Sequence, residues 1–307
     1  MLRLKWKIIK NDIINSVLWF QEHGITPSLR SIFYRLVSLG IIPNTETVYK
    51  RLSSVTVELR KSNKLSWNSI SDESRLVIKN FDERYISPTK YVDEIINLIK
   101  DAHNQYKIPK WHRQPHYVEI WIEKQALADA VQSFLKDKQV VIVINKGYAG
   151  WTFLYKNCNR LKRIKMQGKT PHILYFGDFD PSGADMDRHL YTALSTFRLS
   201  SIDIHRVAIT PTQIETFNLP PIPSDQETIN KLNKDTRKSK FISKYGNLYA
   251  VELDALLAIA PDEFQKLLIE SVDQFFDKTI YQQNIEQYSS NEIQKLIKSK
   301  IQNFDFS

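Results

Sequence analysis

The sequence has little cysteine, little glycine and no long apolar run. Of its 307 residues only Cys158 is a cysteine, which excludes an internal disulfide and a cysteine-rich zinc site. The 8 glycines and 12 prolines are too few for long flexible tracts. No apolar run reaches the ~20 residues of a membrane helix, and the N-terminus "MLRLKWKIIKND" lacks the apolar core of a signal peptide. These absences predict a globular cytoplasmic protein with two or three domains.

The chain also lacks a glycine-rich phosphate loop, so we expect no ATP site on it. It does carry an excess of positive charge, and this excess is uneven. Residues 1–116 hold 19 Lys and Arg against 11 Asp and Glu, whereas residues 117–307 hold 24 against 23. A basic first third indicates a polyanionic partner, most simply nucleic acid; the alternative is a solvated basic surface without a partner.

The hydrophobic pattern divides the chain into four parts. We predict a domain at 1–71, a connector with one helix at 72–116, a domain at 117–210 and a helical extension at 211–307. The first part shows three amphipathic stretches with short connections, followed by "LSWNSISD", which suits a short strand or wing. That order is typical of a winged helix-turn-helix. The third helix would present basic side chains to phosphates, namely Lys50, Arg51, Arg60 and Lys61.

The third part alternates apolar strands with amphipathic helices. The strands are predicted at "YVEIWI", "VVIVI", "HILYF" and "IDIHRVAI", with a helix between each pair. The order βαβαβαβ predicts an α/β domain with a mainly parallel four-stranded sheet and flanking helices.

Three carboxylates follow two of these strands. Glu123 comes directly after the first strand, and Asp178 and Asp180 come directly after the third. Ligands gather at the carboxyl ends of parallel strands, and residues two apart on an extended backbone point the same way. If the two strands are neighbours, these oxygen ligands suit Mg²⁺ or Mn²⁺. The alternative is that the aspartates only cap the Pro-Ser-Gly turn that follows them.

These motifs resemble a known family. "IEKQALADAV", "NKGYAGWTFL" and "GDFDPSGADM" occur in the order and approximate spacing of a Toprim domain. They look most like the Toprim domain of the topoisomerase VI A subunit and of its relative, the meiotic double-strand-break transesterase. The resemblance covers roughly residues 117–210 and extends loosely to a winged-helix domain before them.

The resemblance implies roles for particular residues. Glu123, Asp178 and Asp180 would bind Mg²⁺, and Lys124 and Lys146 would contact phosphate. "RSIFY" matches the segment that carries the nucleophilic tyrosine, which places Tyr34 in that role, with Arg30 best placed to stabilise charge. Tyr34 lies off the apolar stripe of its helix, so the sequence leaves open whether it is a nucleophile or a surface tyrosine. The family also implies a homodimer that spans double-stranded DNA, nucleoid association and, in full topoisomerase VI, a separate ATPase partner.

Three functions remain open from the sequence. The first is Mg²⁺-dependent DNA cleavage by tyrosine transesterification, as in the A subunit of a type IIB topoisomerase. The second is a Toprim nuclease that uses water, and the third is a DNA-binding regulator without activity. His112 and His116 lie four residues apart, a spacing that could place two zinc ligands on one face of a helix. Pro115 disfavours such a helix, so we expect both histidines to be polar linker residues.

Overall fold

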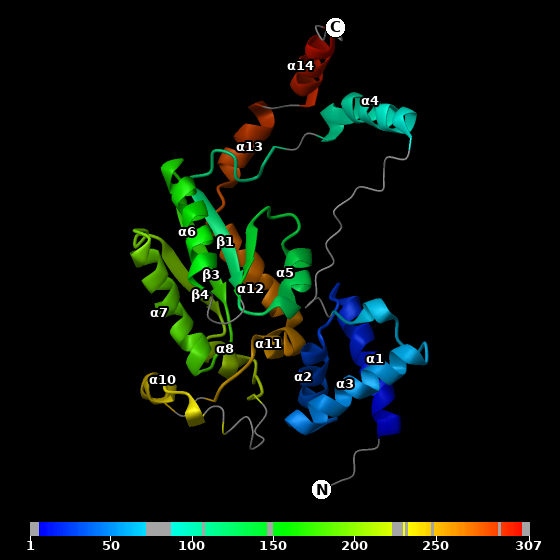
Figure 1. Ribbon diagram of the computed structural model, residues 1–307, viewed down its shortest axis with the longest axis vertical. Helices are drawn as coiled ribbons and strands as arrows, with labels where there is room; N and C mark the ends of the chain where they lie inside the picture. Colours follow the sequence, from blue (N-terminus) through cyan, green and yellow to red (C-terminus); the bar gives the residue numbers. More distant parts are fainter. Residues whose placement is uncertain are drawn as a thin grey trace. The chain divides into compact units, whose positions relative to one another are not determined.

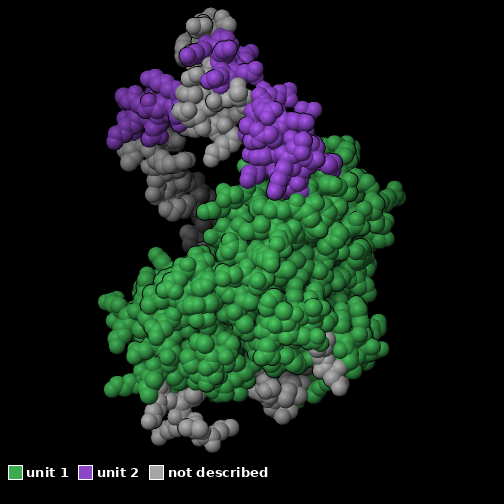
Figure 2. Space-filling model, turned by 180° about the vertical axis from the view of Figure 1, so that it is seen from behind, with its two compact units in different colours: residues 1–74, 116–275 green, residues 75–115, 276–307 purple. Residues whose placement is uncertain are grey.

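The structure is a computed structural model that describes residues 6–71, 87–105, 108–145, 150–222, 230, 233–246, 249–287 and 290–302. The chain forms two compact units, coloured in Figure 2. Unit 1 joins residues 1–74 to residues 116–275, and unit 2 joins residues 75–115 to residues 276–307. The predicted N-terminal domain and the predicted sheet domain therefore lie in one unit.

Three helices open unit 1 (Figure 1). They are α1 (Trp6–Glu22), α2 (Leu29–Ser38) and α3 (Glu46–Lys61). The side chains of Ser28 and Thr45 cap α2 and α3 by accepting backbone N–H groups of the first turn. Both α1 and α3 pack on α2 around buried side chains such as Phe20, Phe33 and Leu52.

The segment after α3 departs from the prediction. Its described residues, 65–71, form one 3₁₀ turn, η1 (Trp67–Ser69), rather than a short strand, and an isolated bridge joins Ser71 to Ser28. The oxygen of Ser66 accepts the N–H of Asn68, which favours this turn over an extended wing. The described residues of this segment thus provide three helices without a strand wing.

The predicted parallel sheet is confirmed. Its strands are β1 (His116–Ile122), β2 (Val141–Ile144), β3 (Thr170–Phe176) and β4 (Asp203–Ala208), in the order β2-β1-β3-β4 and all parallel. The connecting helices are η2 (Gln125–Leu127) with α5 (Ala128–Phe134), α6 (Trp151–Met166) and α7 (Pro181–Thr196). The strands are almost continuous apolar runs because helices cover both faces of the sheet.

Each face of the sheet has its own apolar layer. On one face α6 and α7 pack over Trp121, Val143 and Tyr175. On the other face Phe264 of α12 contacts the ring of Phe176 at the end of β3 and the ring of Phe134 in α5. The described residues of unit 1 are completed by α8 (Pro211–Thr216), α10 (Lys238–Tyr245), α11 (Leu253–Ile259) and α12 (Pro261–Asp273).

In its described residues, the regular secondary structure of unit 2 is helical. It contains α4 (Pro88–Gln105), α13 (Lys278–Gln287) and α14 (Ser290–Gln302), and α4 packs against α14. Of these helices, α4 falls in the predicted connector, and α13 and α14 fall in the predicted C-terminal extension. Among the helices of the described residues, none is both long enough and apolar enough to cross a lipid bilayer.

Candidate functional site at the carboxyl ends of the strands

Adjacent strands bring Glu123 and Asp178 together. β1 and β3 are neighbours, and the N–H of Glu123 extends their ladder by donating to the carbonyl of Phe176. Oε2 of Glu123 accepts the N–H of Asp178 at 3.0 Å and the hydroxyl of Tyr175 at 3.3 Å. The sequence left the proximity of these residues conditional on the first and third strands being neighbours; the strands are neighbours, and Glu123 lies beside Asp178.

Asp180 begins the helix that follows β3. It is the N-cap of α7, and its Oδ1 accepts the N–H of Gly183 at 2.6 Å. A side chain at Gly183 would collide with the carbonyl of Asp178, so the tight turn requires glycine at this position. The capping role anticipated for "DFDPSG" is thus present, while Oδ2 of Asp180 accepts no hydrogen bond from any described residue.

Negative charge is concentrated at this edge of the sheet. Burial raises the pKa of Glu123, and the nearby carboxylate of Asp180 raises it further. Burial likewise raises the pKa of Asp178 to about 8, with contributions from Glu123 and Glu252, although Lys124 opposes the shift. Raised carboxyl pKa values mean that the local positive charge does not fully offset the cost of burying these carboxylates.

Lys124 lies among three carboxylates from two segments of the chain. Its Nζ is 3.2 Å from Oδ2 of Asp178, 3.0 Å from Oε2 of Glu252 and 3.0 Å from Oδ2 of Asp254. Burial alone would lower the pKa of Lys124, but these carboxylates outweigh burial and raise it well above its usual value. The predicted phosphate-contacting lysine is thus an internal counter-charge of the site.

Arg30, on α2, contacts one of the carboxylates that surround Lys124. Its Nε lies 2.9 Å from Oε2 of Glu252, and its second guanidinium nitrogen donates to Oε1 at 3.1 Å, a two-point contact. The guanidinium also covers the ring of Tyr49 at 4.3 Å. Nearby, the hydroxyl of Ser28 donates to Oδ1 of Asp254 at 3.0 Å. The N-terminal helices are therefore held against the sheet edge by Glu252 and Asp254.

Tyr34 is buried, although it lies off the apolar stripe of α2 that the sequence predicts to face the core. Its side chain is 0% exposed and its hydroxyl has no hydrogen-bond partner among the described residues. The reason is that α11 packs against α2, so the helix is covered on a second side besides that of α1 and α3. Burial raises the pKa of Tyr34 well above its usual value, and the carboxylate of Glu252 adds to this effect.

The carboxylates match a divalent cation in donor type. Oε1 of Glu123 and Oδ2 of Asp180 accept no hydrogen bond from the described residues, and oxygen donors are those that Mg²⁺ and Mn²⁺ prefer. Oδ2 of Asp178 is shared with Lys124. A cation at this site would therefore bind Glu123 and Asp180 directly and would compete with the ammonium of Lys124 for Asp178.

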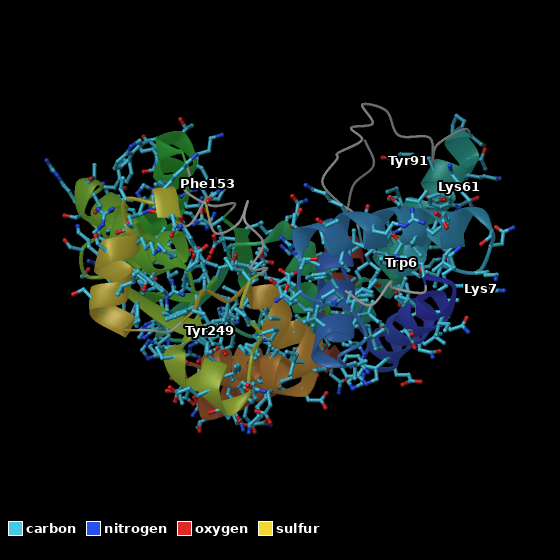
Figure 3. All side chains as sticks on the ribbon, turned by 90° about the horizontal axis from the view of Figure 1, so that it is seen from below. Trp6, Lys7, Lys61, Tyr91, Phe153 and Tyr249 are labelled. Carbon is cyan, nitrogen blue, oxygen red and sulfur yellow. The ribbon has the colours of Figure 1, made fainter. Side chains whose placement is uncertain are left out.

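The basic residues of α3 lie on its outer surface. Lys50, Arg51 and Lys61 are exposed, whereas Arg60 is half-buried beside the ring of Trp67. Lys50 and Lys61 are eleven residues apart, about three helical turns, and so share one face. Figure 3 shows Lys61 at the end of α3 that lies away from the sheet. Lys146 falls outside the described residues.

Sequence reasoning missed Glu252 and Asp254. They follow Val251, which forms an isolated bridge with Phe179 and so places its neighbours beside the Asp178–Asp180 turn. The N–H of Leu253 donates to Oδ1 of Asp178 at 2.8 Å. The sequence feature that could have pointed to Glu252 and Asp254 is "VELD", which places two acidic residues two positions apart at the start of a helix, as "DFDP" does.

Comparison of the chain with protein-family models, with curated proteins and with solved structures gives no match. The class that the fold itself defines is an α/β protein with a four-stranded parallel sheet and flanking helices.

Proposed function

We propose that the protein binds double-stranded DNA and cleaves its phosphodiester backbone in a Mg²⁺-dependent reaction at Glu123, Asp178 and Asp180. The observation that carries this proposal is the contact of Glu123 with Asp178 at the ends of neighbouring strands β1 and β3, with Asp180 near enough to raise the pKa of Glu123. The ligand atoms of the three carboxylates do not all lie within 4.8 Å of one another, so the proposed cation would draw them closer together. Two of them keep an oxygen without a hydrogen bond from the described residues.

The charged residues around the three carboxylates each have a role in this proposal. A divalent cation supplies charge neutralisation for the phosphate under attack. Lys124 keeps Asp178 and its neighbours compatible with burial before the cation binds. Arg30, held by Glu252, places a fixed guanidinium on the side of the site that faces the N-terminal helices. The exposed basic face of α3 attracts the DNA backbone.

The burial of Tyr34 favours water as the nucleophile. A phenol that is 0% exposed, with a pKa raised by burial, is neither accessible nor readily ionised. Transesterification through Tyr34 is the second candidate mechanism. Tyr34 lies on α2, the helix whose Arg30 contacts Glu252 beside the site. That route requires α2 to separate from α11, for example when a homodimer engages DNA.

The first experiment compares the wild type with Asp180→Asn on supercoiled plasmid in the presence of Mg²⁺. Asparagine also caps helices, so the variant keeps the fold while losing a charged ligand. We expect at least about a 100-fold loss of nicking and linearisation. The matched control is Asp185→Asn, which removes an aspartate of the same helix that pairs with Arg188. Undiminished cleavage by Asp180→Asn, or equal loss in both variants, would contradict the proposed site.

A second variant separates the two nucleophiles. Tyr34→Phe removes a hydroxyl that has no partner among the described residues, so the fold should tolerate it. If water is the nucleophile, Tyr34→Phe cleaves plasmid within a few-fold of the wild type, and no protein stays attached to DNA in denaturing gels. A wild-type covalent adduct that disappears in Tyr34→Phe would establish the tyrosine route instead.

A further inference from the structure

A second group of chemically active side chains lies at the other end of the sheet. The register pairs His172 of β3 with Asp203 of β4 and with Val118 of β1. Residues two apart on a strand share a face, so His205 lies on the face of Asp203, and His116 on that of Val118. Three histidines and one aspartate therefore share one face near the start of the strands.

The ligand atoms of three of these residues are close together. His172, Asp203 and His205 each offer one ligand atom, and these atoms all lie within 4.8 Å of one another. In the described parts of the chain, no other group of three His, Cys, Asp or Glu side chains meets this condition. A tetrahedral zinc ion with bonds of about 2.0–2.2 Å holds its ligand atoms roughly 3.4 Å apart. Small side-chain rotations would close the remaining distance.

Two of these side chains have nitrogens without a hydrogen bond. His172 is 6% exposed, and its Nδ1 has no partner among the described residues; the same holds for the buried Nε2 of His205. Burying an imidazole nitrogen without a partner is costly, because the atom loses its hydrogen bond to water. A histidine that only filled the core would be expected to bond through both nitrogens.

His116 and Phe275 complete the surroundings. Nε2 of His172 lies 3.0 Å from Nδ1 of His116, so a hydrogen bond fixes the ring and leaves Nδ1 of His172 as its ligand atom. Metal-binding histidines commonly use their second nitrogen in this way. The ring of Phe275, just after α12, stacks on His172 with centroids 4.0 Å apart and an angle of 25°. It also lies 5.7 Å from the ring of His205.

We propose that His172, Asp203 and His205 bind a single transition-metal ion, of which Zn²⁺ is the best fit, with His116 orienting His172. Two imidazoles and one carboxylate form a donor set typical of zinc, and imidazole nitrogen distinguishes it from the oxygen-only site at the opposite end. Three protein ligands leave a fourth position for water or an exogenous ligand, on the side where Asp203 is exposed. The ion joins the amino ends of β3 and β4.

This site is separate from the carboxylate site. His172 and Asp178 are six residues apart along an extended chain, roughly 20 Å at 3.3 Å per residue. The two sites therefore share no ligand, and a variant at one leaves the other intact. The proposal stands independently of whether the protein cleaves DNA.

The test measures zinc on the full chain. The protein is stripped with EDTA, dialysed against a small excess of Zn²⁺ and then against buffer, and its bound zinc is measured by mass spectrometry. We expect about one zinc per wild-type chain, and at least about a tenfold weaker affinity in His205→Ala and in Asp203→Ala. Both residues are preferable to the buried His172, whose substitution endangers the fold.

Two controls make the outcome decisive. His23→Gln removes a histidine that directly follows α1, far along the chain from these strands, and should bind zinc as the wild type does. Asp180→Asn should also retain it, because Asp180 belongs to the other end of the sheet. The proposal is overturned if the wild type retains no zinc, if His205→Ala and Asp203→Ala retain it with unchanged affinity, or if Asp180→Asn is the variant that loses it.

Discussion

The two ends of the parallel sheet differ in the kind of charge that they bury. At the carboxyl end, the carboxyl groups of Asp178, Glu252 and Asp254 lie 3.0–3.2 Å from the ammonium of Lys124, and Glu252 also contacts Arg30. At the amino end the side chains between the strands are imidazole rings, stacked on Phe275 and bonded to one another. One end is thus held by ion pairs and the other by packing and a single hydrogen bond.

The difference follows from the neighbouring backbone. The carboxyl ends of the strands lead into helix starts, where free N–H groups stabilise anions: Asp180 accepts from α7, and Asp178 accepts from Leu253 at the start of α11. At the amino end the described contacts are among imidazole rings and Phe275, an arrangement that suits neutral nitrogen ligands. A cation that prefers oxygen ligands would therefore bind at the carboxyl end of the sheet, and a metal that prefers nitrogen ligands would bind at the amino end.

The largest expected effect comes from removing Lys124. Lys124→Met leaves Asp178, Glu252 and Asp254 without their shared ammonium, which should lower the free energy of unfolding by about 3 kcal/mol. The matched change at the amino end, His205→Ala, removes a ring whose Nε2 has no partner in the described structure and should cost about 1 kcal/mol or less without zinc. Denaturant unfolding in EDTA measures both. Equal losses would contradict the contrast between the two ends.

The same variant should change the pH dependence of stability. The pKa of Asp178 in the folded protein is raised to about 8, above the value of about 3.9 in the unfolded chain. A raised carboxyl pKa favours the folded state at low pH and loses this contribution as the pH rises from about 4 to 8. Without Lys124 the pKa rises further, so the deficit of Lys124→Met should shrink on acidification. A deficit that grows as the pH falls would refute this account.

The middle of the sheet provides an internal reference for both ends. Cys158 on α6 is buried near Glu119, whose carboxylate makes a two-point contact with Arg160 at 2.7 and 2.8 Å. Burial, with a contribution from Glu119, raises the pKa of Cys158 to about 11. At pH about 8 the thiolate fraction of Cys158 should be roughly 100-fold lower than that of a free cysteine. Burial also limits the access of a reagent to the thiol. Labelling with a thiol reagent should therefore be slow until the protein unfolds.

This labelling also tests whether the two ends are independent. Asp180→Asn and His205→Ala should label as slowly as the wild type, because neither residue belongs to the apolar layer between α6, α7 and the sheet. Rapid labelling in either variant would show that the whole sheet has loosened. A loss of cleavage or of zinc in that variant would then report unfolding rather than a missing ligand.

The sequence predicted the sheet because each strand is rich in apolar residues and each connection between strands has the pattern of a helix. It placed Glu123, Asp178 and Asp180 at one edge for the same reason, since strand ends are local features. It could not predict the contact of Arg30 with Glu252, because 222 residues separate them. The burial of Tyr34 was missed because the stripe of α2 shows one packed face and gives no sign of α11.

The histidines illustrate a further limit of sequence reasoning. His116 was expected in a polar linker, but it begins β1 and bonds to His172. Pro115 rules out a helical pairing with His112, and the sequence gives no direct sign of a pairing across strands. Only the register of β1, β3 and β4 brings together side chains that lie as far apart as residues 116 and 205.

The smallest expected effect concerns the exposed basic face of α3, to which the proposed function assigns the contact with DNA. Lys50 and Lys61 lie on one exposed face of α3, and the double variant Lys50→Gln with Lys61→Gln removes two positive charges there. If both contact phosphates, the slope of log affinity against log salt should decrease by about two, with roughly a tenfold weaker binding near physiological salt. Fluorescence anisotropy with a labelled duplex measures both. The control, Lys295→Gln with Lys298→Gln, removes the same charge from exposed positions of α14 in unit 2. An equal change in both double variants would show that DNA responds to net charge alone, and that α3 does not connect the carboxyl end of the sheet to the duplex.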